Sequence, residues 1–278
     1  MTVLTMILLA AIEGAAGILL LSGAGHLLVF EKLFGVTELP FNLLYLCVVL
    51  HLGNLIAVLL CYRREVLALL RELLMLLHIV KPPRKKRLSV QRRELVMLLV
   101  ALVPMLAVPA LLGVVSALYA GENLLLFVGL ALVLSGVALF FSERFYRGHK
   151  DEKNLTPLDA LLIGLAQVPA VFPGLSRAAL TSSAGVLCGL RRDYAVKFSA
   201  LLSVPVTLAA LVTTAVSAGG SGEMPSFWLC LLGVAVSAAV SFLALKLLQR
   251  IAQFGRFDNF SYWCWGAGII SMVLVLIA

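Results

Sequence analysis

An arginine, two hydroxyls and a Pro-Gly pair lie close together inside a long apolar stretch of this chain. The segment is Pro173-Gly-Leu-Ser-Arg177, and Thr181 follows it by four residues. Apolar segments run into and out of it, so we expect Arg177 to lie at membrane depth. An arginine there costs about 2.5–3.5 kcal/mol and usually lines a substrate or ion path. The alternative is an arginine at a helix end whose side chain reaches back to the membrane surface.

The chemistry that these residues favour is phosphate binding. A guanidinium stays charged and matches two phosphate oxygens at once. Proline and glycine break the helix, and exposed backbone at membrane depth survives only where it faces protein or a water-filled cavity. We therefore expect Gly174, Ser176, Arg177 and Thr181 to bind a phosphate group. Ser176 is also a candidate nucleophile if a base lies near it.

A second polar group lies near the N-terminus. Glu13 is the one carboxylate candidate inside the apolar core, and it is followed by Ser22 and His26. His26 is a candidate general acid, general base or phosphate donor, and Ser22 a candidate phosphate ligand. Two structural alternatives stay open. Glu13 and Arg177 could form a buried ion pair without a role in chemistry, and His26 could be a hydrogen-bonded packing residue. His51 fits packing and a polar cavity wall equally well.

The composition says which kind of protein positions these residues. Of 278 residues, 62% are hydrophobic and only 13% are charged. These values indicate a polytopic, all-α membrane protein that forms one integral-membrane domain over residues 1–278, and they exclude an ordinary soluble domain. The net charge of +8 does not indicate nucleic-acid binding, because the basic residues lie in short loops. The five cysteines lack paired spacing and are interpreted as small buried hydrophobes.

Loop charge predicts the topology. Residues 81–93 carry seven basic residues and no acidic one, so this loop is expected in the cytoplasm. Residues 65–80 have cytoplasmic charge at both ends and are predicted to form an interfacial helix or a shallow dip. The predicted spans are 41–62, 95–118, 124–143, 198–217, 227–246 and 260–278.

Two pairs of apolar pieces are shorter than the roughly 20 residues that a span needs. Residues 157–171 and 175–190 have basic residues at both outer ends, which predicts a re-entrant hairpin with its tip at residues 172–181. Residues 3–12 and 18–31 are predicted to form a second hairpin that enters from the opposite face.

Opposed hairpins are typical of an inverted-topology repeat with its binding site near the membrane midplane. The approximate repeats are residues 1–80 and 157–217. Their internal spacing agrees, because Glu13 precedes Ser22 by nine residues and Gln167 precedes Ser176 by nine.

The chain resembles the undecaprenyl-diphosphate phosphatases, integral-membrane enzymes linked to bacitracin resistance. The segment Ile12–His26 looks like the family's first box, where a glutamate-glycine pair leads to a Ser-Ser-Thr-Gly-His run. The stretch 158–177 with Thr181 looks like the second box. The run after it also matches, at Arg192, Ala195, Phe198, Ser199, Leu201, Leu202 and Pro205.

This resemblance implies an inverted-repeat enzyme that hydrolyses undecaprenyl diphosphate to the monophosphate and so recycles the carrier lipid for cell-wall synthesis. It implies a multi-pass protein of the bacterial inner membrane, a site open toward the periplasm or cell exterior, and a divalent cation, Mg²⁺ or Ca²⁺. Carried over by position, Glu13 is the first acidic residue and metal ligand. Ser22 and His26 end the first box, and Ser176, Arg177 and Thr181 belong to the phosphate loop.

The chain departs from the family pattern at several positions. The family has a second acidic residue four positions after the first, where this chain has Gly17. The other differences are at Leu20, Gly23, Ala24, Ala178, Ala179, Leu180 and Cys264. The missing carboxylate matters most, because two carboxylates are the natural way to hold Mg²⁺ or Ca²⁺ beside a diphosphate.

The sequence therefore leaves three classes of function open. The first is a lipid-diphosphate phosphatase that works with Glu13, His26, Ser176 and Arg177. The second is a non-catalytic polyprenyl-phosphate binder or transporter on the same fold, because the phosphate-binding arginine is kept and part of the acid–base set is lost. A small-solute or ion transporter is the third, and only Glu13 could couple it to protons or cations. The substitution Gly17→Glu is expected to separate the first two. The sequence gives no sign of the oligomeric state.

Overall fold

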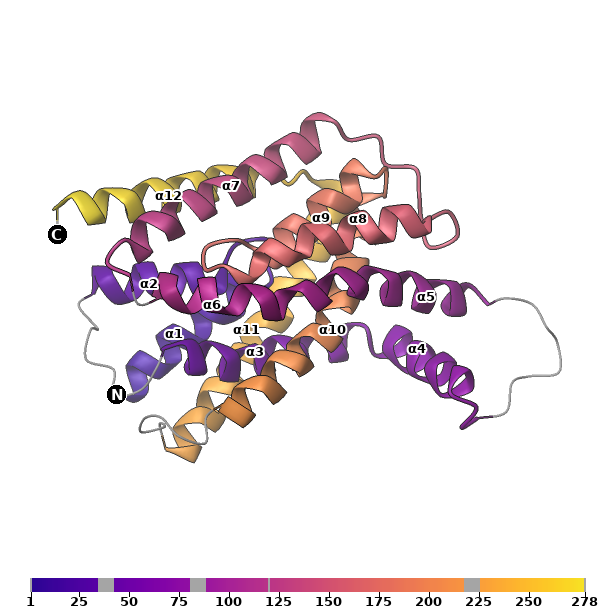
Figure 1. Cartoon of the computed structure of the whole chain (residues 1–278), viewed down its shortest axis with the longest axis horizontal. Helices are drawn as coiled ribbons and strands as arrows, with labels where there is room; N and C mark the ends of the chain where they lie inside the picture. The colour runs from indigo at the N-terminus through magenta and orange to yellow at the C-terminus, as the bar shows by residue number, and fades with distance from the viewer. Residues whose placement is uncertain (1, 35–42, 81–88, 120, 218–225, 278) are drawn as a thin grey trace.

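The computed structural model describes residues 2–34, 43–80, 89–119, 121–217 and 226–277, and every regular element in these ranges is a helix (Figure 1). The expected all-α fold is therefore confirmed. Two predicted loops lie largely outside the described residues: 81–88 of the basic loop, and 218–225 of the loop that follows the span ending at 217.

Five helical stretches are long and apolar enough to cross a membrane. They are α5 (Val90–Leu102) with η1 (Val103–Ala107) and α6 (Val108–Tyr119), α7 (Leu124–Arg144), α10 (Arg192–Ser217), α11 (Phe227–Phe254) and α12 (Asp258–Ile277). A sixth candidate is α3 (Leu43–Cys61) taken together with α4 (Arg63–Leu76). The chain is thus a multi-pass helical membrane protein, with spans where loop charge predicts them.

Two of these stretches are not single straight helices, and they add detail to the predicted topology. α4 turns away from α3 by 90°, which is how a helix lying along the membrane surface would leave a span. The expected span 95–118 is not one regular helix, because η1 interrupts it. Pro104 and Pro109 explain the break, since each lacks the N–H that an α-helix uses and its ring crowds the preceding turn.

The two predicted hairpins are present as pairs of short helices. α1 (Val3–Ala16) and α2 (Gly23–Leu33) form one; α8 (Pro157–Gln167), η2 (Val168–Val171) and α9 (Arg177–Leu187) form the other. In Figure 1 the open end of the α1–α2 hairpin lies at the left and that of the α8–α9 hairpin at the right, so the two are opposed.

The turns of the two hairpins have the same local structure. Ser22 caps α2 by accepting a hydrogen bond from the N–H of Gly25, and Ser176 caps α9 in the same way from the N–H of Ala179. Two residues before each serine, the backbone is left-handed, with φ of 63° at Leu20 and 91° at Gly174. This likeness supports the inverted repeat predicted from the nine-residue spacing.

Candidate active site

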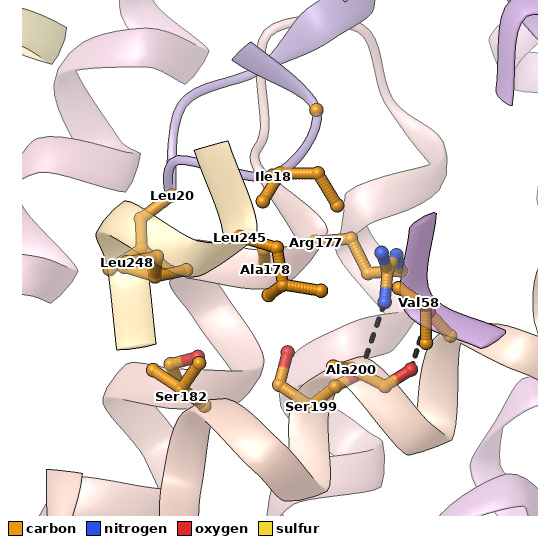
Figure 2. Close-up of a pocket in the computed structure, with 13 residues that line it drawn as sticks. Ile18, Leu20, Val58, Arg177, Ala178, Ser182, Ser199, Ala200, Leu245 and Leu248 are labelled. Carbon is orange, nitrogen blue, oxygen red and sulfur yellow. Dashed lines mark hydrogen bonds between the residues drawn. The ribbon is translucent and has the colours of Figure 1, made fainter. Parts of the chain in front are cut away.

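Arg177 is the first residue of α9 and lines a small cavity of about 20 Å³, roughly the space of one water molecule (Figure 2). Its Nη1 donates to the Ser199 carbonyl of α10 at 3.4 Å. Within the described residues it forms no ion pair, so the suggested pairing with Glu13 is not seen. Arg177 is therefore a partly buried cation whose other donors have no hydrogen-bond partner among the described residues and can bind an anion.

Glu13 is fully buried in α1, and its carboxylate contacts three side chains of α3. Asn54 Nδ2 donates to Oε1 at 3.3 Å, His51 Nδ1 lies 3.3 Å from the same oxygen, and Cys47 Sγ donates to Oε2 at 3.8 Å. His51 thus belongs to a polar cluster and not to apolar packing. Asn54 and Cys47 are not among the site residues predicted from the sequence, although a lone asparagine inside an apolar span is a signal that could have indicated the first.

Two glycines border the Glu13 carboxylate. A Cβ at Gly23 would overlap Oε2, and a Cβ at Gly17 would lie 3.0 Å from Oε1. Gly17 also lines the Arg177 cavity. The Glu13 cluster and the Arg177 cavity therefore meet at Gly17, the position where the family pattern has a second carboxylate.

The hydroxyls of Ser176 and Thr181 are already engaged. Ser176 Oγ accepts from the N–H of Ala179 at 3.2 Å and donates to the Leu21 carbonyl at 2.5 Å. Thr181 Oγ1 donates to the Arg177 carbonyl at 2.7 Å and lies 2.6 Å from Ser199 Oγ. Among the described residues no acid or base is hydrogen-bonded to Ser176, so these hydroxyls brace the turn that carries Arg177. Their contact with phosphate stays a prediction.

Gly174 shapes the same turn. Its φ of 91° lies in the left-handed region that favours glycine, and a Cβ there would lie 2.6 Å from the Val128 carbonyl of α7. Ser135 of α7 accepts from the N–H of Ser176 at 3.0 Å. The Pro-Gly break therefore lets the turn pack directly against α7. Phosphate binding by Gly174 stays a prediction.

His26 and Ser22 lie in the other hairpin and do not line the Arg177 cavity. His26 Nδ1 lies 2.7 Å from the Ser22 carbonyl, and Nε2 accepts from Trp263 Nε1 of α12 at 2.9 Å. Both ring nitrogens are thus engaged, with the Nδ1 proton donated to Ser22. In the aromatic stretch 262–265, the family comparison drew attention to Cys264, whereas the residue that contacts His26 is Trp263.

Comparison with known protein families shows to which family this chain belongs. The sequence model described as "Bacitracin resistance protein BacA" matches residues 6–270. The chain belongs to this family. Curated relatives named undecaprenyl-diphosphatase include one from Trichlorobacter lovleyi, 31% identical over 277 residues that cover 99% of this chain and 98% of the relative. One from Methanobrevibacter smithii is 30% identical over 280 residues, with 97% and 96% covered. The resemblance seen in the sequence is confirmed.

The BacA family resemblance implies Mg²⁺ or Ca²⁺, and the residues at Glu13 do not fit such an ion. Both cations take several oxygen ligands, whereas this cluster offers one carboxylate beside an amide, an imidazole and a thiol. Both Glu13 oxygens already accept hydrogen bonds. Within the described ranges, no group of three or more His, Cys, Asp or Glu residues is arranged to hold a metal ion. No step of the reaction is therefore assigned to a cation held by Glu13.

Proposed function

We propose that this BacA family member hydrolyses undecaprenyl diphosphate to the monophosphate and so returns the carrier lipid to cell-wall synthesis. The curated relatives are named for this activity, and they match this chain over nearly their whole length. The observation that carries the proposal in this chain is Arg177, a cation without an ionic partner among the described residues that lines a cavity beside the meeting point of two hairpins.

Arg177 binds the terminal phosphate, because its guanidinium can donate to two of the phosphate oxygens. Water attacks the terminal phosphorus, the bond from that phosphorus to the bridging oxygen breaks, and inorganic phosphate leaves the lipid monophosphate. Glu13 accepts the proton of the attacking water. Its carboxylate borders Gly17, and Gly17 lines the cavity. Ser176 acts as a positioning residue, because its hydroxyl donates to Leu21 and has no base beside it.

The orientation follows from where basic residues gather. Arg192 of α10 pairs with Glu143 of α7, Arg256 lies 3.9 Å from the same carboxylate, and Lys150 pairs with Asp159. These contacts bring the basic ends of several helices to one end of the bundle. By the positive-inside rule this end faces the cytoplasm. As the family resemblance implies, we propose that the site lies in the bacterial inner membrane and is open toward the opposite, periplasmic side.

Phosphate release from a polyprenyl diphosphate by the purified protein in detergent tests the proposal. We expect release in the wild type and a loss of at least about 100-fold in Arg177→Ala, because charge-assisted contacts to phosphate strengthen as charge builds up in the transition state. Arg191→Ala is the matched control, since Arg191 is exposed and its side chain pairs with Asp193 alone in the described part of the chain.

Two results would contradict hydrolysis at this site. Release that is unchanged in Arg177→Ala would place the chemistry elsewhere. No release by the wild type, together with lipid-phosphate binding that depends on Arg177, would make the protein a binder or carrier that does not cleave its lipid.

A further inference from the structure

Asn54 fills the space that a side chain at position 17 would need. A Cβ built on Gly17 would overlap Asn54 Nδ2, and it would lie 2.7 Å from the Glu13 carbonyl and 3.0 Å from Glu13 Oε1. Asn54 is only 7% exposed, and α3 is packed against α11 on its other side. Any residue larger than glycine at position 17 would therefore have to displace a buried amide.

Hydrogen bonding fixes which end of the amide faces Glu13. The NH₂ group of Asn54 donates to Glu13 Oε1, 3.3 Å away, so this end of the amide faces the carboxyl group. The Oδ1 end then faces α11, where the hydroxyl of Ser241 donates to it at 2.5 Å and that of Ser237 lies 3.5 Å away. The amide is thus held from both ends.

The helices around Asn54 leave it little freedom to move. Ser237 also donates to the Leu50 carbonyl of α3 at 2.9 Å. A Cβ at Gly14 of α1 would lie 2.7 Å from the Ser237 carbonyl, and one at Gly53 of α3 would lie 2.6 Å from the Ser237 side chain. Because α1 and α3 both approach α11 this closely, the cluster of Glu13, Asn54, Ser237 and Ser241 ties three helices together.

We propose that Asn54 takes the place of the side chain missing at position 17 and holds the Glu13 carboxylate by a hydrogen bond, where two carboxylates would otherwise share a divalent cation. Asn54 is then a positioning residue for Glu13. Its catalytic meaning rests on the proposed phosphatase function, whereas its effect on cation binding does not.

The charge arrangement explains why the amide and a cation exclude each other. The NH₂ end of Asn54 carries partial positive charge and lies against Oε1, so a cation at that oxygen would have to displace it. Replacing this donor by an acceptor of the same shape makes the site favour a cation, because two buried carboxylates repel until a cation neutralises them. Asn54→Asp makes this replacement without adding an atom.

The deciding experiment is the thermal stability of the purified protein in detergent, measured in EDTA and with Ca²⁺ or Mg²⁺. We expect the Tm of the wild type to be the same in all three conditions. Asn54→Asp is expected to have a lower Tm in EDTA and to regain it as Ca²⁺ is added, because a ligand that binds only the folded state stabilises it. Asn54→Ala, which loses the amide without gaining a charge, is the control and should show no rise with cation.

A second pair of variants tests the space at position 17. Gly17→Glu alone is expected to lower the Tm or the yield of folded protein, so this substitution by itself does not restore a family site. Gly17→Glu combined with Asn54→Ala should recover folding and gain a rise in Tm with cation. Gly17→Gln combined with Asn54→Ala, of the same size but uncharged, should not gain it.

Two results would overturn the proposal. One is a saturable rise in wild-type Tm with Ca²⁺ or Mg²⁺ that disappears in Glu13→Gln, because Glu13 would then be a cation ligand beside Asn54. The other is Gly17→Glu that folds and binds cation equally well with and without Asn54, because the amide would then not compete for the space.

An activity measurement separates this proposal from the proposed function. If the protein releases phosphate, Asn54→Ala should lower kcat by up to about 100-fold with little change in KM, because a reactive group misplaced by about 1 Å can lose that much rate. If the wild type releases none, the phosphatase fails, and the Tm series still decides what holds Glu13.

Discussion

The hydroxyl of Ser176 donates a hydrogen bond of 2.5 Å to the backbone carbonyl of Leu21, 155 residues earlier in the chain. This bond joins the turns of the two opposed hairpins. Ser176 also caps α9 at the residue before Arg177. One buried hydroxyl therefore fixes both the contact between the hairpins and the start of the helix that carries the proposed phosphate ligand.

Ser176→Ala is expected to destabilise the protein by about 1–3 kcal/mol, because it removes a helix cap and leaves a buried carbonyl without its donor. The change in Tm on thermal unfolding in detergent measures it. Ser183→Ala is the matched control: Ser183 lies in the same helix, is 1% exposed, and its hydroxyl has no hydrogen-bond partner in the described part of the chain. Equal Tm values for the two variants would refute the bracing role.

Gly23→Ala is expected to impair the Glu13 site. A Cβ at position 23 would overlap Glu13 Oε2, so the carboxylate or the start of α2 must shift. We expect a loss of about 1–3 kcal/mol in stability together with reduced phosphate release. Gly113→Ala in α6 is the control, since a Cβ there meets nothing within 4 Å, and alanine favours a helix by about 0.5–1 kcal/mol. Similar behaviour of the two variants would contradict the close packing around Glu13.

The turn at Gly174 allows backbone strain to be separated from close packing. Gly174 and Gly189 both have a positive φ, 91° and 89°. A Cβ at Gly174 would press on the Val128 carbonyl at 2.6 Å, whereas the nearest atoms to one at Gly189 belong to flexible side chains, His149 at 3.2 Å and Lys150 at 3.8 Å. Gly189→Ala should cost about 1–2 kcal/mol from strain alone, and Gly174→Ala clearly more. Unfolding midpoints in the opposite order would show that the turn does not need to touch α7.

The ion pair between Arg192 and Glu143 is expected to stabilise the end of the bundle that we propose faces the cytoplasm. Two hydrogen bonds of 2.8 and 2.7 Å join them, the Glu143 side chain is 1% exposed, and the guanidinium lies 3.6 Å from the centre of the Tyr146 ring. Arg192→Ala leaves the buried carboxylate with Arg256, 3.9 Å away and itself exposed, as its one ionic partner among the described residues, so we expect a loss of about 3–5 kcal/mol.

Arg191→Ala is the control for this pair, because the exposed Arg191–Asp193 contact should contribute at most about 1 kcal/mol. Tm values measured in parallel for the two variants give the comparison. A loss in Arg192→Ala no larger than in Arg191→Ala would show that the buried pair does not hold α7 and α10 together.

The sequence by itself determined the membrane class, the spans and the two hairpins. Runs of apolar residues and clusters of loop charge are local properties, and they act through the membrane without reference to any partner helix. Arg177 was singled out by an equally local signal, an arginine next to a helix break in an apolar segment, and the structure places it on a cavity wall. Its binding of phosphate stays a prediction. The two prolines inside the predicted span 95–118, Pro104 and Pro109, are also visible in the sequence, and η1 interrupts the helix at them.

Only the tertiary structure decided which side chains meet. Asn54 lies 41 residues from Glu13, and Trp263 lies 237 residues from His26. Such contacts depend on how each helix is rotated about its axis and how closely glycines and serines let the helices approach, and no local pattern fixes either. For this reason the sequence showed that Gly17 lacks a carboxylate, while the packing of α1, α3 and α11 placed the Asn54 amide in its space.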